Sequence, residues 1–166
     1  MRRPVVPTFA LVVTALVALS GCGVLDDLTS GGEPERDEQG SVTEAATDDV
    51  LALKVGDCLD STDLGETVEE VPFVPCGEAH DSEVYASTEL ADGDYPGEKV
   101  IEKTSDAFCY GRFASFVGLD YESSALDYYP LYPVEDGWNF IDDREVLCVI
   151  IDLDGDVTGT LQSAAR

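Results

Sequence analysis

The distribution of apolar and polar residues divides the chain into three parts. Residues 5–18 form an apolar run shortly after Arg2 and Arg3. Residues 23–49 are polar and acidic without periodicity, and beyond them apolar residues recur at strand and helix spacing. The pattern therefore predicts three segments: a leader at residues 1–21, a tether at residues 22–50 and a folded domain at residues 51–166.

The first part of the folded domain has the period of two that is typical of β-strands with one buried face. Residues 51–55 alternate in this way, and a second strand is expected at residues 68–75. Pro72 and Pro75 favour a sheet edge or an irregular course for this second strand, because proline cannot donate a hydrogen bond to a sheet ladder. Residues 81–90 alternate again and predict a third strand.

Residues 96–117 form the segment with the clearest helical pattern. Asp94 or Tyr95 is expected at the cap position, and Gly118 suits a left-handed helix end. Arg112 projects from this helix, and because an unpaired charge near the core is costly, we expect a carboxylate or several carbonyls beside it. Four side chains fall on one face at a period of 3.6 residues and are expected to pack on the sheet: Ile101, Phe108, Cys109 and Phe116.

The last third of the chain returns to strand patterns. Residues 121–133 are rich in tyrosine and contain two prolines, which favours an extended segment over a central strand. Residues 145–151 are almost continuously apolar, as expected for a strand covered on both faces in the middle of the sheet. Asp154-Gly155 predicts a hairpin turn with a return strand at residues 157–161. These elements predict an α+β domain, with a mainly antiparallel sheet of about five to six strands on one long helix.

The leader ends in Leu19-Ser20-Gly21-Cys22, which has the form of a lipoprotein processing site. Pro4 and Pro7 shorten the uninterrupted apolar stretch to about a dozen residues, against roughly 20 needed to span a bilayer. An uncleaved membrane anchor is therefore the weaker reading. Acyl chains such as palmitate on Cys22 would anchor the mature chain, and everything after Cys22 would then be extracytoplasmic.

The charge balance narrows the classes of partner. The chain carries a formal net charge of −26, with 35 acidic residues against 9 lysines and arginines. Nucleic acid is excluded, because phosphate binding needs clustered cations. An acidic surface also repels anionic headgroups, so the lipid on Cys22 is the expected contact with the membrane. Between residues 23 and 49 the sole cation is Arg36, and this composition predicts a disordered, self-repelling spacer.

Four cysteines remain after Cys22, and in an oxidising compartment an even count indicates disulfides. Four cysteines allow three pairings, and the spacing favours Cys58 with Cys76 and Cys109 with Cys148. The competing reading is a zinc site with four thiolate ligands, which normally needs pairs of cysteines two to four residues apart. The sequence has no such pair, so we expect no metal and no other cofactor.

Several short motifs together resemble the septum-formation domain of bacterial cell-envelope proteins. The resemblance covers residues 51–161 and implies an extracytoplasmic domain, often on lipoproteins or membrane-anchored chains of high-GC Gram-positive bacteria, associated with septation. Ala79 and Asp142 depart from the family pattern, which commonly has a proline before the histidine and a glycine before the Asp-Arg pair. The motifs are Val55-Gly56-Asp57-Cys58, Val74-Pro75-Cys76, His80-Asp81-Ser82-Glu83-Val84, Cys109, and Trp138 ahead of Asp143-Arg144 and Cys148.

His80 is the sole histidine, and with Asp81 and Glu83 nearby it invites an acid–base role. Catalysis would also need a nucleophile or reactive water and an orienting group on the far ring nitrogen, which no motif supplies. We therefore interpret His80 as a residue that hydrogen-bonds a turn. Glu83 is expected to pair with Arg112 or Arg144. Arg144 is expected to tie the turn at residues 80–83 to the central strand.

Two further groups of residues have alternative readings. Asp152, Asp154 and Asp156 could bind calcium weakly, but their spacing fails the EF-hand pattern and hairpin chemistry explains Asp154-Gly155. Trp138 and the tyrosines could form a sugar or peptide platform, although such aromatics more often cap a core. The tyrosines in question are Tyr128, Tyr129 and Tyr132.

The sequence thus predicts a non-enzymatic binding or structural module on the extracytoplasmic face of the cell membrane. It would be held by lipid on Cys22, with cell-envelope or division proteins as partners. The alternative is a cell-wall hydrolase that uses acidic residues, but no spacing singles out a catalytic pair of carboxylates.

Overall fold

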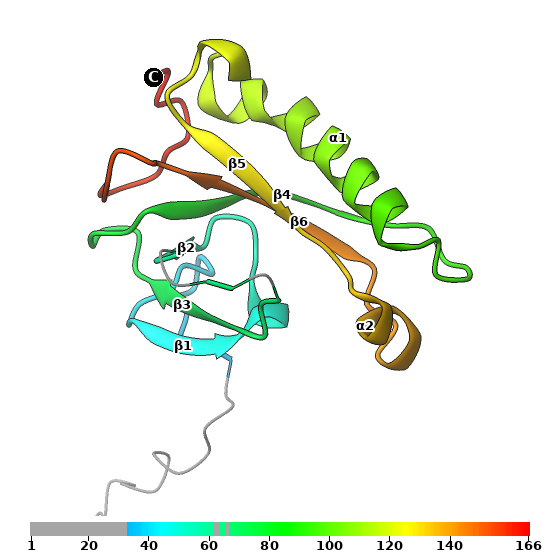
Figure 1. Ribbon diagram of the computed structural model, residues 1–166. Helices are drawn as coiled ribbons and strands as arrows, with labels where there is room; N and C mark the ends of the chain where they lie inside the picture. The colour runs from blue at the N-terminus through cyan, green and yellow to red at the C-terminus, as the bar shows by residue number, and fades with distance from the viewer. Residues whose placement is uncertain (1–32, 62–63, 66) are drawn as a thin grey trace, which may run out of the picture. The chain divides into compact units, whose positions relative to one another are not determined.

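The computed structural model describes residues 33–61, 64–65 and 67–166. The leader, Cys22 and the first part of the predicted tether lie outside the described residues. Within them, six strands form an antiparallel sheet in the order β1-β3-β2-β4-β6-β5 (Figure 1). The strands are β1 Ala46–Asp49, β2 Cys58–Leu59, β3 Glu70–Val74, β4 Ser82–Glu89, β5 Asp127–Leu131 and β6 Glu145–Ile151.

One long helix packs on this sheet, which confirms the predicted α+β class. Helix α1 lies along β5 and the paired strands β4 and β6 (Figure 1). A short helix, α2, follows β5, and sequence patterns did not predict it. The helices are α1 Glu98–Val117 and α2 Glu135–Phe140, with 3-10 turns η1 Val50–Ala52 and η2 Tyr121–Ser123.

Strand β6 is covered on both faces, as predicted. Its side chains alternate between two hydrophobic clusters, with Val146, Cys148 and Ile150 in the cluster under α1. Leu147 and Val149 belong to the other cluster, which lies against the N-terminal strands. Hydrogen bonding to β4 on one side and β5 on the other completes its enclosure.

Helix α1 buries a stripe of side chains four residues apart, the spacing that keeps side chains on one helix face. The predicted Ile101 and Cys109 lie on this stripe, whereas Phe108 and Phe116 flank it and are partly buried. The helix begins after Gly97 rather than at the predicted Asp94 or Tyr95 cap, and it ends at Gly118 with φ 83° as expected. The buried stripe is Ile101, Ser105, Cys109, Phe113 and Val117.

Tyr85 joins the helix to β4 and gives the fold a sensitivity to alkaline pH. Its hydroxyl donates to the carbonyl oxygen of Cys109 at 2.8 Å, and burial raises the pKa of this phenol. A raised pKa in the folded state contributes stability that is complete below the unfolded value of about 10 and is lost as pH rises above it. The melting temperature should therefore fall steeply above about pH 10.

Replacement of Tyr85 by phenylalanine should make this fall shallower, at a cost near neutral pH of about 1 kcal/mol for the lost hydrogen bond. Calorimetry between pH 7 and 11 measures both effects. Tyr110→Phe is the control, because it also removes a phenol hydrogen bond, to Glu122 at 2.5 Å, but at an exposed position on α1. That hydrogen bond raises the pKa of Tyr110 too, but without burial in the core the effect is smaller, so this variant should keep a steeper fall. Equal pH profiles for the two variants would contradict a role for Tyr85.

The N-terminal part of the domain departs most from the sequence prediction. Residues 51–55 do not form a strand: η1 opens the segment, capped by the Asp49 carboxylate, which accepts from the Leu51 amide at 2.8 Å. Strand β3 is not at a sheet edge either, because β1 pairs along one side of it and β2 along the other. Pro72 remains compatible with this place, and its carbonyl accepts from the Asp60 amide at 3.2 Å.

The predicted tether at residues 22–50 is corrected where the structure describes it, from Glu33 onwards. Strand β1 lies within this range, and Arg36 pairs with Val42 in an isolated β-bridge. The Arg36 guanidinium contacts both carboxylate oxygens of Asp57, at 2.5 and 2.8 Å, and donates to the Ala52 carbonyl at 3.0 Å. A long-range ion pair therefore holds an acidic segment whose composition alone indicates disorder.

Both predicted disulfides are confirmed. Cys58–Cys76 joins β2 to the loop after β3, and Cys109–Cys148 joins α1 to β6, with Cα–Cα distances of 5.2 and 5.4 Å. Cys58, Cys109 and Cys148 are fully buried. Each disulfide thus connects two elements that pack together but lie apart in the sequence.

The C-terminal segment covers one end of the sheet without forming the predicted return strand. After the turn at residues 153–154, Val157 pairs with His80 as an isolated bridge. The amides of Ser163 and Ala165 then donate to carbonyls at the end of α1, at 2.8 and 2.9 Å. These local contacts to several elements replace the hairpin ladder that Asp154-Gly155 suggested.

Candidate functional site

The structure separates the candidate residues chosen from the sequence. His80, Asp81 and Glu83 lie at the start of β4, whereas Arg144 lies beside the far end of that strand. The register sets this separation, because Ser82 of β4 faces Ile151 and Glu89 faces Glu145. At about 3.3 Å per residue the two ends of β4 are roughly 20 Å apart.

His80 is almost completely buried, at 1% exposure. Its ring nitrogen Nδ1 lies 2.8 Å from the carbonyl oxygen of Glu78, and its backbone exchanges hydrogen bonds with Val157. These contacts confirm the interpretation of His80 as a residue that hydrogen-bonds a turn. They also fix the C-terminal segment against the start of β4.

Glu83 is buried at 4% exposure and binds the C-terminal segment. Its carboxylate accepts from the Thr160 hydroxyl at 2.8 and 3.0 Å and from the Leu161 amide at 2.6 Å. The predicted pairing of Glu83 with Arg112 or Arg144 is wrong. Hydrogen-bond donors from a loop distant in the sequence satisfy this carboxylate, and the residues around Glu83 do not indicate such distant donors.

Asp81 takes part in a second buried polar group. One carboxylate oxygen accepts from the Ser61 amide at 2.8 Å and from the Ser61 hydroxyl at 2.9 Å. The Ser61 hydroxyl also lies 2.6 Å from that of Ser82. The acid–base side chains at residues 80–83 are therefore engaged in hydrogen bonds that join segments of the fold.

Arg144 forms a different structural centre, which we call the arginine–tryptophan corner: Tyr95, Trp138 and Arg144. The guanidinium carbon lies 3.8 Å from the centre of the Trp138 ring, a cation–π distance. The guanidinium also donates to the carbonyls of Trp138 and Asp143, at 3.0 and 2.7 Å. Arg144 is thus a clamp, as predicted, but its predicted partners at residues 80–83 are wrong.

Two exposed carboxylates complete the surroundings of Arg144. Asp142 contacts the guanidinium at 2.8 Å and Asp92 at 3.7 Å, with side-chain exposures of 82% and 91%. Asp142 has φ 58°, in the left-handed region that glycine favours and aspartate tolerates. This backbone conformation suits the glycine that the family commonly has at this position, and aspartate can adopt it as well. The Asp142 carboxylate adds a contact with Arg144 that glycine could not make.

Trp138 anchors α2 to the loop before α1. Its indole nitrogen donates to the Gly93 carbonyl at 2.9 Å, and its ring meets that of Tyr95 edge to face, with 5.9 Å between centroids. The suggested platform of Trp138 with the tyrosines is not formed. Tyr128 packs in the cluster under α1, whereas Tyr129 packs in the cluster on the other face of the sheet.

Arg112 is exposed on α1, and its guanidinium lies over the Phe108 ring at 5.1 Å from the centroid. The carboxylate or carbonyls expected beside it are therefore not needed. The helix turns Arg112 out of the buried stripe that Cys109 and Phe113 define. Water and an aromatic face accommodate its charge.

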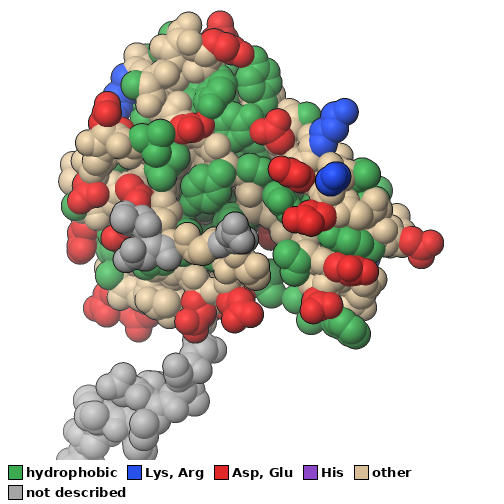
Figure 2. Space-filling view, in the orientation of Figure 1, with side chains coloured by type: hydrophobic (Ala, Val, Ile, Leu, Met, Phe, Trp, Pro, Cys, Tyr) green, Lys and Arg blue, Asp and Glu red, His purple; other side chains and the backbone are tan. Residues whose placement is uncertain are grey.

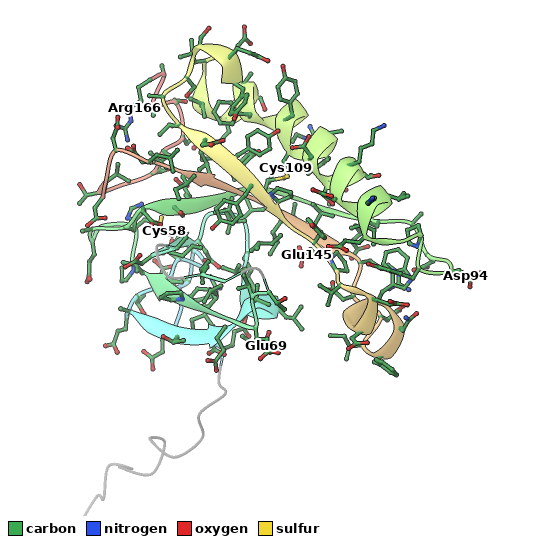
Figure 3. The ribbon with its side chains drawn as sticks, viewed as in Figure 1. Cys58, Glu69, Asp94, Cys109, Glu145 and Arg166 are labelled. Atoms are coloured by element: carbon green, nitrogen blue, oxygen red, sulfur yellow. A yellow bond between two sulfur atoms is a disulfide. The ribbon has the colours of Figure 1, made fainter. Side chains whose placement is uncertain are left out.

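An open hollow of about 520 Å³ lies next to the arginine–tryptophan corner. The carboxylates that line the hollow repel one another. The pKa of Glu145 is raised, first by burial and then by the negative charges of Asp143 and Glu89. Figure 3 labels Glu145 at the start of β6 and Asp94 in the loop that precedes α1. The hollow is lined by Glu89, Leu90, Ala91, Asp92, Asp142, Asp143, Arg144 and Glu145.

Large apolar side chains are exposed at both ends of α2. Val134 precedes the helix at 50% exposure, Phe140 ends it at 80%, and Ile141 follows at 62%. In Figure 2, red carboxylates and green apolar side chains lie interleaved over the region where Figure 1 draws α2. Sequence reasoning missed this surface, although Val134, Trp138 and Ile141 have helical spacing and Glu135-Asp136 suits a helix start.

The described residues do not form a metal centre. Within residues 33–61, 64–65 and 67–166, no three metal-ligating side chains cluster. Asp152, considered for calcium, is paired with Arg166 and accepts from the Asp154 amide at 3.0 Å. The helices of the described range also lack the length and apolar content to cross a bilayer.

Comparison with known proteins gives one assignment. A search of curated proteins found no match to this chain. A search of solved structures found none either. The family model described as septum formation matches residues 20–148, a range that contains all five cysteines. The chain therefore belongs to the septum formation family.

Proposed function

We propose that this chain is a lipid-anchored, extracytoplasmic module of the cell envelope that acts in septum formation by binding rather than by catalysis. The observation that supports binding rather than catalysis is the burial of the side chains that could act as acids or bases. His80, Asp81 and Glu83 are each buried to more than nine-tenths and hydrogen-bonded within the fold. A substrate in solvent would have no direct access to them.

The extracytoplasmic location rests on the two disulfides. Disulfides persist in oxidising compartments and are rare in the cytosol. Here Cys109–Cys148 lies within the main hydrophobic cluster, so it belongs to the folded core. The family assignment adds the connection with septum formation.

The membrane anchor rests on the N-terminal sequence, which lies outside the described residues. Arg2 and Arg3, the apolar run and Leu19-Ser20-Gly21-Cys22 have the order of a lipoprotein leader. Two or more acyl chains on Cys22 would give lasting attachment at about 0.8 kcal/mol per buried CH2. The partners proposed are the membrane lipid and proteins of the envelope or division machinery, with nucleic acid excluded by the charge of −26.

Replacement of Cys22 by alanine tests the anchor, because it removes the acylated thiol. The variant should leave the membrane fraction or accumulate with its leader uncleaved, whereas the wild-type protein should stay with the membrane and incorporate labelled palmitate. Fractionation and mass analysis of the N-terminal peptide measure both. Ser20→Ala keeps the thiol and the small residue before Gly21, so it serves as the matched control and should behave like the wild type.

An unmodified mature N-terminus on the wild-type protein would refute the anchor.

The absence of catalysis has a separate test, in which the purified protein is incubated with peptidoglycan and the soluble products are analysed by chromatography. Release of fragments above the level given by heat-denatured protein would refute the non-enzymatic part of the proposal.

A further inference from the structure

We infer that α2 and the adjoining acidic hollow form a docking surface for a basic protein segment that carries apolar side chains. This inference rests on the proposed binding function and assigns it a surface and a class of partner. The surface is formed by Phe140, Ile141, Glu89, Asp92 and Glu145, and we call it the α2 surface.

The apolar part of the α2 surface is the first step of the argument. Phe140 is 80% exposed and Ile141 62%, next to each other at the end of α2. Exposed apolar side chains that stand singly are common, but a grouped set with a polar rim is typical of an interaction site. Trp138 lies on the same helix at 4% exposure and fixes it to the body of the domain.

The charge around these side chains selects the partner. Among the residues that the structure describes, the adjoining hollow is lined by five carboxylates and one cation, Arg144, which is already engaged with Trp138 and Asp142. Burial and neighbouring negative charges disfavour ionised Glu145. A lysine or arginine placed in the hollow would offset this repulsion, whereas an anionic lipid or glycan would increase it. Charge complementarity therefore favours a basic segment.

The acidic part of the α2 surface is also ordered before any partner binds. Arg144 holds the loop at residues 142–143 by its contacts with Asp142 and the Asp143 carbonyl, and Asp143 accepts from the Glu145 amide at 3.0 Å. Two acidic segments, residues 89–92 and 142–145, line the hollow. They are joined directly, because the Leu90 amide donates to the Arg144 carbonyl at 2.8 Å and Glu89 pairs with Glu145 at the end of the β4–β6 ladder. A surface ordered in advance loses less conformational entropy on binding.

The test uses the purified full-length protein in detergent and a synthetic peptide of alternating lysine and leucine, labelled for fluorescence anisotropy. The wild-type protein should bind this peptide, with an affinity that falls as salt rises. Phe140→Ser with Ile141→Ser should weaken binding at least about tenfold. Glu89→Gln with Glu145→Gln should weaken it and flatten the salt dependence.

Matched controls change the same chemistry elsewhere. Leu153→Ser removes an apolar side chain that is 67% exposed, and Glu38→Gln with Glu44→Gln removes two exposed charges of the N-terminal segment. Both should bind like the wild type. Melting temperatures of every variant establish that the fold is kept.

The inference would be overturned if the wild type does not bind, if the variants of the α2 surface bind equally well, if the controls lose binding equally, or if anionic vesicles bind through Phe140 and Ile141. Dimerisation that Phe140→Ser abolishes would assign the surface to a second copy and would also overturn it. None of these results bears on the Cys22 experiment. Failure of the docking surface can therefore be distinguished from failure of the proposed anchor.

Discussion

Arg36→Ala is expected to lower the free energy of unfolding by about 3–5 kcal/mol, the range for removal of one partner of a buried ion pair. The Arg36 and Asp57 side chains are 10% and 2% exposed. Without the guanidinium, the buried Asp57 carboxylate would lose its cation and keep the hydrogen bond that it accepts from the Lys54 amide at 2.8 Å. Residues 33–42 would also lose their contact with the Ala52 carbonyl.

Lys54→Ala is the matched control for Arg36→Ala. Lys54 pairs with Glu33, which has the same sequence separation as the Arg36–Asp57 pair, but both side chains are more than half exposed. Loss of an exposed pair should cost less than about 1 kcal/mol. Urea unfolding followed by tryptophan fluorescence gives both values.

A third variant distinguishes the ion pair from simple packing. Arg36→Met with Asp57→Leu removes both charges and retains volume, so it should recover part of the stability lost in Arg36→Ala. If Arg36→Ala unfolds at the same urea concentration as Lys54→Ala, the order of the N-terminal segment does not depend on the Arg36–Asp57 pair.

Removal of the Cys109–Cys148 disulfide by double alanine replacement should cost about 4 kcal/mol in the chain-entropy account of disulfide stabilisation. Its cysteines are 39 residues apart, against 18 for Cys58–Cys76. The shorter loop predicts a smaller loss of about 3 kcal/mol. Cys109 and Cys148 also lie in the cluster under α1, so their truncation adds a packing cost that increases the difference.

Calorimetry compares the stability lost in this variant with that lost in the second double variant, Cys58→Ala plus Cys76→Ala. The Cys109 and Cys148 pair should show the larger fall in melting temperature, on the order of 15 °C. A larger fall for the Cys58 and Cys76 pair would show that the N-terminal strands, rather than the contact of α1 with the sheet, limit the stability of the domain.

The elements that the sequence predicts well are those whose own residues determine burial. Strand β6 has an almost unbroken apolar run, and α1 has both the periodicity and the left-handed Gly118 at its end. The disulfide partners also followed from spacing. In these cases the local pattern and the tertiary environment favour the same structure.

The failures have the opposite cause. Strand β1 lies in an acidic stretch of low β propensity, and it is ordered through pairing with β3 and through the nearby ion pair of Arg36 with a residue 21 positions away. The partners of Arg144 depend on a turn in which Asp142 adopts a positive φ, which no local preference of aspartate specifies. The candidate residues at 80–83 were chosen for their chemistry, but burial determines their role.

The contacts of Glu83 determine when the domain can complete its fold. The hydrogen bonds that its carboxylate accepts come from residues 77 and 78 positions further along the chain. Before residues 160–161 have been synthesised, β4 can form but the Glu83 carboxylate lacks those donors, and an unsatisfied buried charge strongly disfavours closure of the core. The domain should therefore remain open until residues 160–161 have left the ribosome.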